Sequence, residues 1–367
     1  MARRQGNKPV YKKKKTEEEI RIEQEAIEKE QHRRRNVSRH SVMIVAFSAI
    51  FVAVAFIGRW VYAVQDGFYD SYVKVDDTVD TALSGATGLT HTDEENEALT
   101  ALGTDWDLFT GSRLRDEVYV TLDGDDPSDK ESTTLHAGLY YNESDITVIV
   151  LQRFGLDSTD DFLAGSALYE ETGCNILLPD ARCHGESTGD VFGWGYFEQN
   201  DIAVWCNEID SMYGEQKYIL WGEGVGANTA LFAALNGLLP DSVCAIVAES
   251  PYGSVHQLAN RNIFKWYAVP GFPFLTAIEA KVNMTDNGFK ISDTNLLKTI
   301  ENAGTSTDIP VLFTYSTGDE FIPADYTTEL IEAYPDANKQ QIKGSGTHGT
   351  VFSECEDEIL SQIKEQL

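Results

Sequence analysis

The pattern of apolar and polar positions changes twice along this chain. Residues 1–40 are strongly polar, residues 42–58 are almost continuously apolar, and from about residue 111 short apolar runs alternate with amphipathic stretches. A short apolar run bounded by turn residues predicts a buried strand, and a helical spacing of apolar positions predicts a helix. The pattern therefore predicts a charged leader, one long apolar helix and a folded body.

The body is predicted to start with strands and to end with a helix. The runs at 117–122 and 134–141 predict a β-hairpin, because a polar turn rich in Asp, Gly and Pro separates them. Further strands are expected at 147–151, 175–179, 217–221, 243–248 and 311–315, with a short one near 340–342. Helices are expected at 160–172, at 199–213, after Gly226 and at 353–367. This alternation predicts an α/β fold with a doubly wound, mostly parallel sheet.

A long insertion separates two of the expected strands. Residues 250–308 exceed an ordinary crossover connection, and they contain an aromatic and proline-rich run at 266–275. Ligands of open α/β sheets usually bind at the carboxyl ends of the strands, where this insertion starts. We expect a helical cap over a binding cleft, the alternative being an insertion that only extends the core.

The apolar run is long enough to cross a membrane. Ser48 is the only polar side chain between residues 42 and 58, and a helix from 41 to 64 would measure about 36 Å, against about 30 Å for a hydrocarbon core. Basic clusters at 12–15 and 33–35 precede it, so the positive-inside rule places the N-terminus in the cytoplasm. We expect an uncleaved signal anchor in the cell membrane. The alternative is a cleaved signal peptide, since residues 61–63 loosely fit a cleavage site.

These patterns divide the chain into four parts. They are a basic cytoplasmic tail (1–40), a transmembrane helix (41–65), an acidic juxtamembrane linker (66–110) and an extracytoplasmic body (111–367). Trp106 and Phe109, at the end of the linker, are expected to pack onto the body rather than to bind a ligand.

The distribution of charge excludes one class of partner. The formal net charge is −30, yet residues 1–40 hold 13 basic and 7 acidic residues, whereas residues 66–367 hold 15 basic and 52 acidic ones. So acidic a body repels nucleic acid, and no basic groove with interleaved aromatic residues is visible. The five cysteines are scattered without metal-ligand spacing, so no metal site is expected. No cofactor is expected either.

The stretch after the expected strand at 217–221 points to chemistry. Its glycine-spaced turn, Gly222-Glu223-Gly224-Val225-Gly226, leads into a helix of small residues. A strand, a sharp turn and a helix with the pattern G-x-S-x-G form the nucleophile elbow of α/β-hydrolases. Gly224 stands where that pattern has its serine.

From residue 147 to the C-terminus the chain resembles the α/β-hydrolase superfamily, and within it the membrane-anchored bacterial esterase or serine-aminopeptidase-like branch. The matching landmarks, in the family's order, are Leu177–Ser187, Gly193–Tyr196 with Asp201 and Trp205, Trp221–Gly226, Asp319–Pro323 and Thr347–Gly349. The resemblance covers the body but neither the leader nor the 66–110 stretch.

This resemblance implies a set of roles at the site. It makes Asp319 the acid and His348 the base of a catalytic triad, and Gly224 the vacant nucleophile position. The backbone N–H groups of Val225 and Phe154 are the implied oxyanion donors.

The sequence departs from the family at a second position. Gln152-Arg153 stands where the resemblance leads to His-Gly, next to the oxyanion donors, and a large cation replaces the glycine there. Because Gly224 has no side chain, His348 has no hydroxyl to activate. Both departures predict a degenerate hydrolase that binds a small apolar, acyl or peptide ligand, or a partner, in a retained cleft.

Two other functions stay open at this point. An active hydrolase of esters, thioesters or peptides would use Asp319 and His348 to activate water or a displaced nucleophile, for which Ser250, Ser187 and Cys183 are candidates. A purely structural surface protein would bind no ligand at all.

Overall fold

The computed structural model describes most of the body and the long N-terminal helix. The described residues are 16–72, 106–122, 132–153, 164–189, 191–267, 271–284, 288–303, 308–335 and 338–366. The chain divides into two compact units, Met1–Val61 and Tyr62–Leu367. Phe154 and most of the predicted linker (66–110) lie outside the described residues.

Helix α1 (Glu17–Tyr72) runs through the predicted span at 41–65. Thr16 and Glu19 cap it reciprocally, since the side chain of each accepts a hydrogen bond from the backbone N–H of the other. Within the described part of the chain, no helix meets the length and apolarity needed to cross a membrane. Eleven side chains of the predicted span lie outside that part, at 41, 42, 44, 45, 49 and 60–65. The helix is confirmed, and the membrane span stays a prediction.

In the described part of the body, eight strands form one sheet, in the order β1-β2-β4-β3-β5-β6-β7-β8. The strands are β1 (Asp116–Thr121), β2 (Thr134–Tyr140), β3 (Ile146–Leu151), β4 (Asn175–Pro179), β5 (Lys217–Glu223), β6 (Val243–Glu249), β7 (Val311–Ser316) and β8 (Lys339–Gly344). The β1–β2 and β2–β4 pairs are antiparallel, and every other neighbouring pair is parallel. The mostly parallel sheet and its first hairpin are therefore confirmed.

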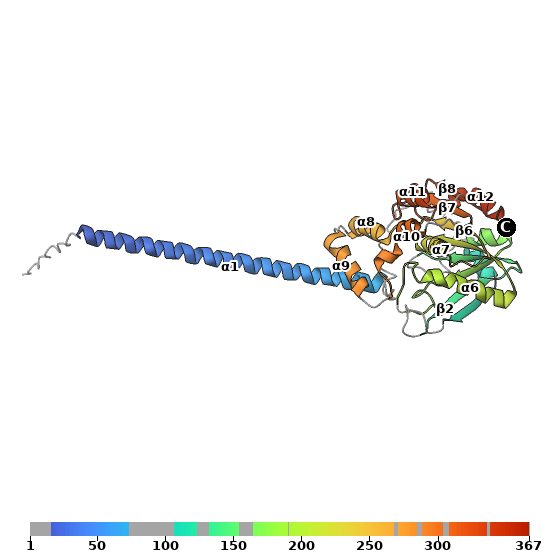
Figure 1. Cartoon of the computed structure of the whole chain (residues 1–367), viewed down its shortest axis with the longest axis horizontal. Coiled ribbons are helices and arrows are strands. Elements are labelled where there is room, and N and C mark those ends of the chain that lie inside the picture. The colour runs from blue at the N-terminus through green and yellow to red at the C-terminus, as the bar shows by residue number, and fades with distance from the viewer. Residues whose placement is uncertain are drawn as a thin grey trace, which may run out of the picture. The chain divides into compact units, whose positions relative to one another are not determined.

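Helices cover both faces of this sheet (Figure 1). They are α5 (Gly165–Thr172), α6 (Glu198–Tyr213), α7 (Val225–Leu235), α11 (Ala324–Ala333) and α12 (Val351–Lys364). One core layer contains Trp205 of α6, Phe232 of α7 and Leu330 of α11, and the other contains Leu168 of α5 and Ile359 of α12. Alternate residues of each strand enter opposite layers, which is why the buried strands read as continuous apolar runs.

The segment just before β1 packs onto the body, as expected. Trp106 and Phe109 are buried, with ring centroids 5.4 Å apart, and both rings contact Tyr140 on β2. This aromatic cluster fixes the point at which the chain enters the sheet.

The insertion between β6 and β7 is helical in its described part, as predicted. It contains α8 (Val255–Tyr267), α9 (Gly271–Met284), a 3₁₀ turn η1 (Ile291–Thr294) and α10 (Leu296–Ala303). Helices α8 and α9 lie side by side (Figure 1), and Nδ1 of His256 contacts the carboxylate of Glu279 between them. Whether these helices cover a ligand cleft stays a prediction.

Candidate active site

The turn between β5 and α7 has the geometry of a nucleophile elbow. Gly224 adopts φ 55° and ψ −109°, its N–H donates to the carbonyl of Glu249 at 2.9 Å, and its carbonyl accepts from Asn228 at 3.0 Å. A residue with a side chain is strained at such a positive φ by about 1–3 kcal/mol, a cost that active sites commonly bear. Gly224 therefore occupies the sharp turn that the sequence pattern predicts.

Backbone contacts require the two glycines that flank this turn. A Cβ atom on Gly226 would overlap the carbonyl of Leu151 at the end of β3, and one on Gly222 would overlap the backbone of Gly226. A Cβ atom on Gly224 would meet only Cδ1 of Ile322, at 3.3 Å. Close packing thus dictates the outer glycines, whereas position 224 has room for a side chain.

Asp319 and His348 lie together at the carboxyl end of the sheet. Asp319 follows β7 and His348 precedes α12, and Nδ1 of His348 donates to Oδ2 of Asp319 at 2.7 Å. The other carboxylate oxygen of Asp319 accepts the N–H groups of Phe321 and Ile322 at 2.8 and 2.7 Å. The acid is therefore both a turn cap and the partner of the histidine.

The loops that carry these two residues are hydrogen-bonded to each other. Gly318 donates to the carbonyl of Gly346 at 2.9 Å, and Thr317 donates to that of Gly344 at 3.0 Å. The carboxylate of Glu354, in the first turn of α12, accepts the N–H of Gly346 at 2.7 Å. This network fixes the imidazole with Nδ1 toward the acid and Nε2 toward the elbow.

The group at Nε2 of His348 is a carboxylate. Oε1 of Glu223, the last residue of β5, lies 3.2 Å from Nε2, and Nη1 of Arg153 donates to the same oxygen at 3.4 Å. Arg153, Glu223, His348 and Asp319 thus form a row of alternating charge. The sequence analysis missed Glu223. Strand alternation was the available signal, because residues 219, 221 and 223 of β5 share the face on which α12 packs.

This row changes the acid–base properties of the histidine. Burial alone would lower the pKa of His348, but the charge of Asp319 and hydrogen bonds to Asp319 and Glu223 outweigh it and raise the pKa to about 10. Burial would raise the pKa of Glu223, but the charge of Arg153 and the contact with His348 lower it to about 2. His348 is therefore an imidazolium at neutral pH, and an imidazolium cannot accept a proton as a general base.

The remaining predicted residues are spread around this row. Val225 is the first residue of α7, so its N–H belongs to the helix N-terminus. Ser250 is buried and donates to Oδ2 of Asp319 at 3.4 Å. Ser187 donates to the carbonyl of Asp180 at 2.8 Å.

Cys183 belongs to the same loop as Ser187 and lies against Gly189. In the part of the chain that the structure describes, none of the three displaced candidates takes the place next to Nε2 that Glu223 occupies.

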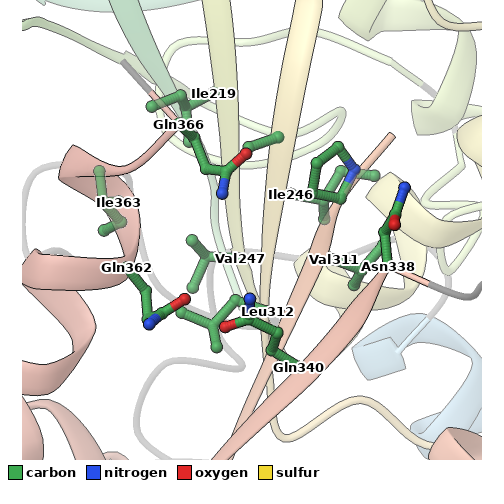
Figure 2. A pocket seen from close by; sticks show the side chains of 12 residues that line it. Ile219, Ile246, Val247, Val311, Leu312, Asn338, Gln340, Gln362, Ile363 and Gln366 are labelled. Carbon is green, nitrogen blue, oxygen red and sulfur yellow. The ribbon is translucent and has the colours of Figure 1, made fainter. Parts of the chain in front are cut away.

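A separate small pocket lies toward the other end of the strands (Figure 2). Its apolar floor includes Val247 and Leu312, and its rim carries the amide side chains of Asn338, Gln340, Gln362 and Gln366. The strand residues that line it belong to the first or middle parts of β5, β6, β7 and β8, whereas Gly224 follows the end of β5. Among the described residues, no group of three or more His, Cys, Asp or Glu side chains is arranged to hold a metal.

Comparisons with known proteins agree with this architecture. The esterase Pf2001 of Pyrococcus furiosus superposes with a TM-score of 0.54 at 19% identity, over 70% of this chain and 92% of the esterase. Another crystal form of that esterase gives 0.51 at 20% identity, over 70% and 90%. The chain has the α/β-hydrolase fold. At such identities, the likeness shows the fold alone.

Sequence comparison adds one relative of unknown activity. The uncharacterized protein YqkD of Bacillus subtilis is 24% identical over 201 residues, which is 54% of this chain and 64% of the Bacillus protein. The chain thus matches less than two thirds of that protein's length. No protein-family profile matches the chain.

Proposed function

We propose that this chain is a membrane-anchored, extracytoplasmic protein of the α/β-hydrolase fold that binds a small apolar, acyl or peptide ligand, or a partner, and does not act as a serine hydrolase. The observation that carries the proposal is the contact between Glu223 and Nε2 of His348, next to the vacant position 224.

Serine hydrolysis needs a nucleophile and a neutral base, and the site supplies neither. Gly224 has no hydroxyl, and each ring nitrogen of His348 faces a carboxylate. Loss of the nucleophile alone removes several orders of magnitude in rate from enzymes of this type. The protonated histidine is a second obstacle, because it cannot take the proton that an attacking hydroxyl or water must release.

An apolar wall beside the vacant position supports an apolar ligand. Ile322 approaches Gly224 and packs in a cluster with Tyr252, against Trp194 and Phe321. Trp194 and Phe321 are only partly buried, and their remaining apolar surface favours a ligand with an acyl or aromatic part, because apolar surfaces gain free energy by leaving water together.

The surface of α1 supports the membrane anchor. The side chains of Phe47, Phe51 and Phe56 are 68–75% exposed, and they belong to the apolar run that follows the basic residues 33–35. Large apolar side chains at this density gain free energy in lipid, and the preceding arginines favour a cytoplasmic N-terminus.

The loss of catalysis is tested on the purified full chain with a fluorophosphonate probe and a panel of ester, thioester and peptide substrates. We expect no labelling and no turnover above the buffer rate. Turnover that disappears in His348→Ala would overturn the proposal.

Ligand binding is tested by thermal unfolding in the presence of acyl chains and short peptides. A ligand that binds the folded state raises the unfolding temperature with concentration. If no compound of either class stabilises the protein, the structural surface protein becomes the better interpretation.

Membrane anchoring is tested by fractionating cells that express the full chain or residues 66–367. We expect only the full chain to resist alkaline extraction from membranes, and external protease to reach its body. Recovery of both forms in the soluble fraction would contradict the anchor.

The hydrogen bond between Asp319 and His348 favours a second candidate, a hydrolase that activates water at the vacant position. This activity requires neutral His348, so its rate would rise tenfold per pH unit up to about pH 10. A flat pH profile of any turnover excludes it.

A further inference from the structure

Side chains on one face of the cap helix α8 donate hydrogen bonds to the loop that follows Asp319. Nη1 of Arg261 donates to the carbonyl of Glu320 at 2.8 Å, and Nζ of Lys265 donates to the same carbonyl at 3.2 Å. Lys265 also pairs with the carboxylate of Glu320, and Nδ2 of Asn262 donates to the carbonyl of Phe321 at 3.4 Å. Residues four apart share a helix face, so Arg261 and Lys265 act together on one peptide group.

The same peptide groups also donate hydrogen bonds to the carboxylate of Asp319. The N–H groups of Phe321 and Ile322 donate to Oδ1 of Asp319. The peptide groups that join residues 320–321 and 321–322 therefore accept from α8 at their carbonyl oxygens and donate to the Asp319 carboxylate through their N–H groups. The ring of Phe321 lies 5.2 Å from that of His348. Displacement of this loop would therefore move both the N–H groups that donate to Asp319 and the Phe321 ring that lies beside the imidazole of His348.

The segment that enters α8 reaches the same carboxylate. Ser250, just after β6, holds a φ of 45° and donates to Oδ2 of Asp319, the oxygen that binds His348. A non-glycine residue at positive φ is maintained only when its surroundings determine it. Both the entry and the outer face of α8 are thus attached to Asp319.

We propose that α8 is a positioning element for the Asp319–His348 pair, and that ligands which move the cap change this hydrogen bond through the peptide groups of Glu320 and Phe321. This inference rests on the proposed function only for the existence of such a ligand. Binding of an acyl or peptide group under the cap would thus change the Asp319–His348 hydrogen bond without any chemical step.

The link is tested without a ligand on the full chain in detergent micelles, with ¹⁵N-labelled histidine. The ring signals of His348, assigned by their loss in His348→Gln, are titrated by NMR in the parent protein and in Arg261→Ala/Lys265→Ala. Release of the loop should lower the proton affinity of His348 about tenfold, which is one pKa unit. Lys265→Arg, which keeps the cation, should retain the parent titration.

Lys298→Ala is the matched control, because Lys298 is an exposed lysine on α10. It should leave the His348 signals unchanged. If the double variant does not fold, Asn262→Ala and Lys265→Ala are titrated singly, and each should give a smaller shift of the same sign.

An unchanged His348 titration in a folded variant overturns the link, even if the unfolding temperature falls. That failure is distinguishable from failure of the proposed function, which is decided by substrate turnover and ligand binding. A shifted titration together with absent turnover and ligand-dependent stabilisation upholds both.

Discussion

Restoring the serine alone should not restore a normal hydrolase. In Gly224→Ser the new Cβ meets only the flexible end of Ile322, so the side chain fits, at a strain cost of about 1–3 kcal/mol from the positive φ. The hydroxyl would then share Nε2 of His348 with the carboxylate of Glu223. Protonation of His348 would then limit the rate of hydrolysis by this variant.

The size of this limit follows from the pKa of the base. With a pKa of about 10, roughly one His348 in 300 is neutral at pH 7.5, whereas a histidine with the usual pKa is mostly neutral there. Glu223→Gln removes the charge at Nε2 and leaves Asp319 in place. We therefore expect Glu223→Gln/Gly224→Ser to exceed Gly224→Ser by about 100-fold in kcat/KM at pH 7.5.

The assay is hydrolysis of p-nitrophenyl acetate between pH 6 and 10.5. The single variant should gain about tenfold per pH unit until near pH 10, and the double variant should reach its plateau at a lower pH. Glu223→Gln alone is the control, and it should stay inactive because it has no hydroxyl at position 224. Equal rates at pH 7.5 in the single and double variants, with the same pH profile, would refute the reasoning.

Three further predictions concern stability. Because the folded state raises the pKa of His348, the stability that its protonation contributes is complete below about pH 6.5. The free energy of unfolding should then fall by about 1.4 kcal/mol per pH unit toward pH 10. Urea titrations should show this slope, and an equal slope in His348→Gln would contradict it. Gly226→Ala should cost more than about 4 kcal/mol by overlap with Leu151, whereas Gly111→Ala, with open space around its Cβ, should change stability by less than about 0.5 kcal/mol; equal thermal melts would contradict this. His136→Ala should cost about 3 kcal/mol in denaturant unfolding, because it leaves the buried Asp180 without its 2.6 Å partner, and an unchanged midpoint would show that this pair contributes nothing.

Most of the fold was predictable because its signals are local. Each buried strand needs its own apolar run, and each connection needs its own turn residues, so β4 was predicted with the bounds that the structure has. The weakest prediction was the helix expected at 160–172, of which the structure describes α5 from Gly165. The order of strands in the sheet was not predicted and is known from the structure alone, because strand pairing depends on residues far apart in the chain.

The site was predictable only in part. Asp319 and His348 could be placed because each follows or precedes a recognisable element, and the structure brings them within hydrogen-bond distance. Glu223 carried only the weaker signal of strand alternation, since its position in the elbow pattern tolerates any residue. The resemblance directed attention to the vacant Gly224, whereas the carboxylate that helps to keep His348 protonated comes from the residue before it.

The sequence by itself determined that position 224 lacks a nucleophile, because a missing side chain is a covalent fact. The glycine spacing also predicted the sharp turn, whereas the close contacts that require Gly222 and Gly226 appear only in the folded chain. Only the tertiary structure decided the state of His348. The pKa of a buried group depends on the charges around it, and here the parallel pairing of strands places Arg153, Glu223 and Asp319 in one row with the imidazole.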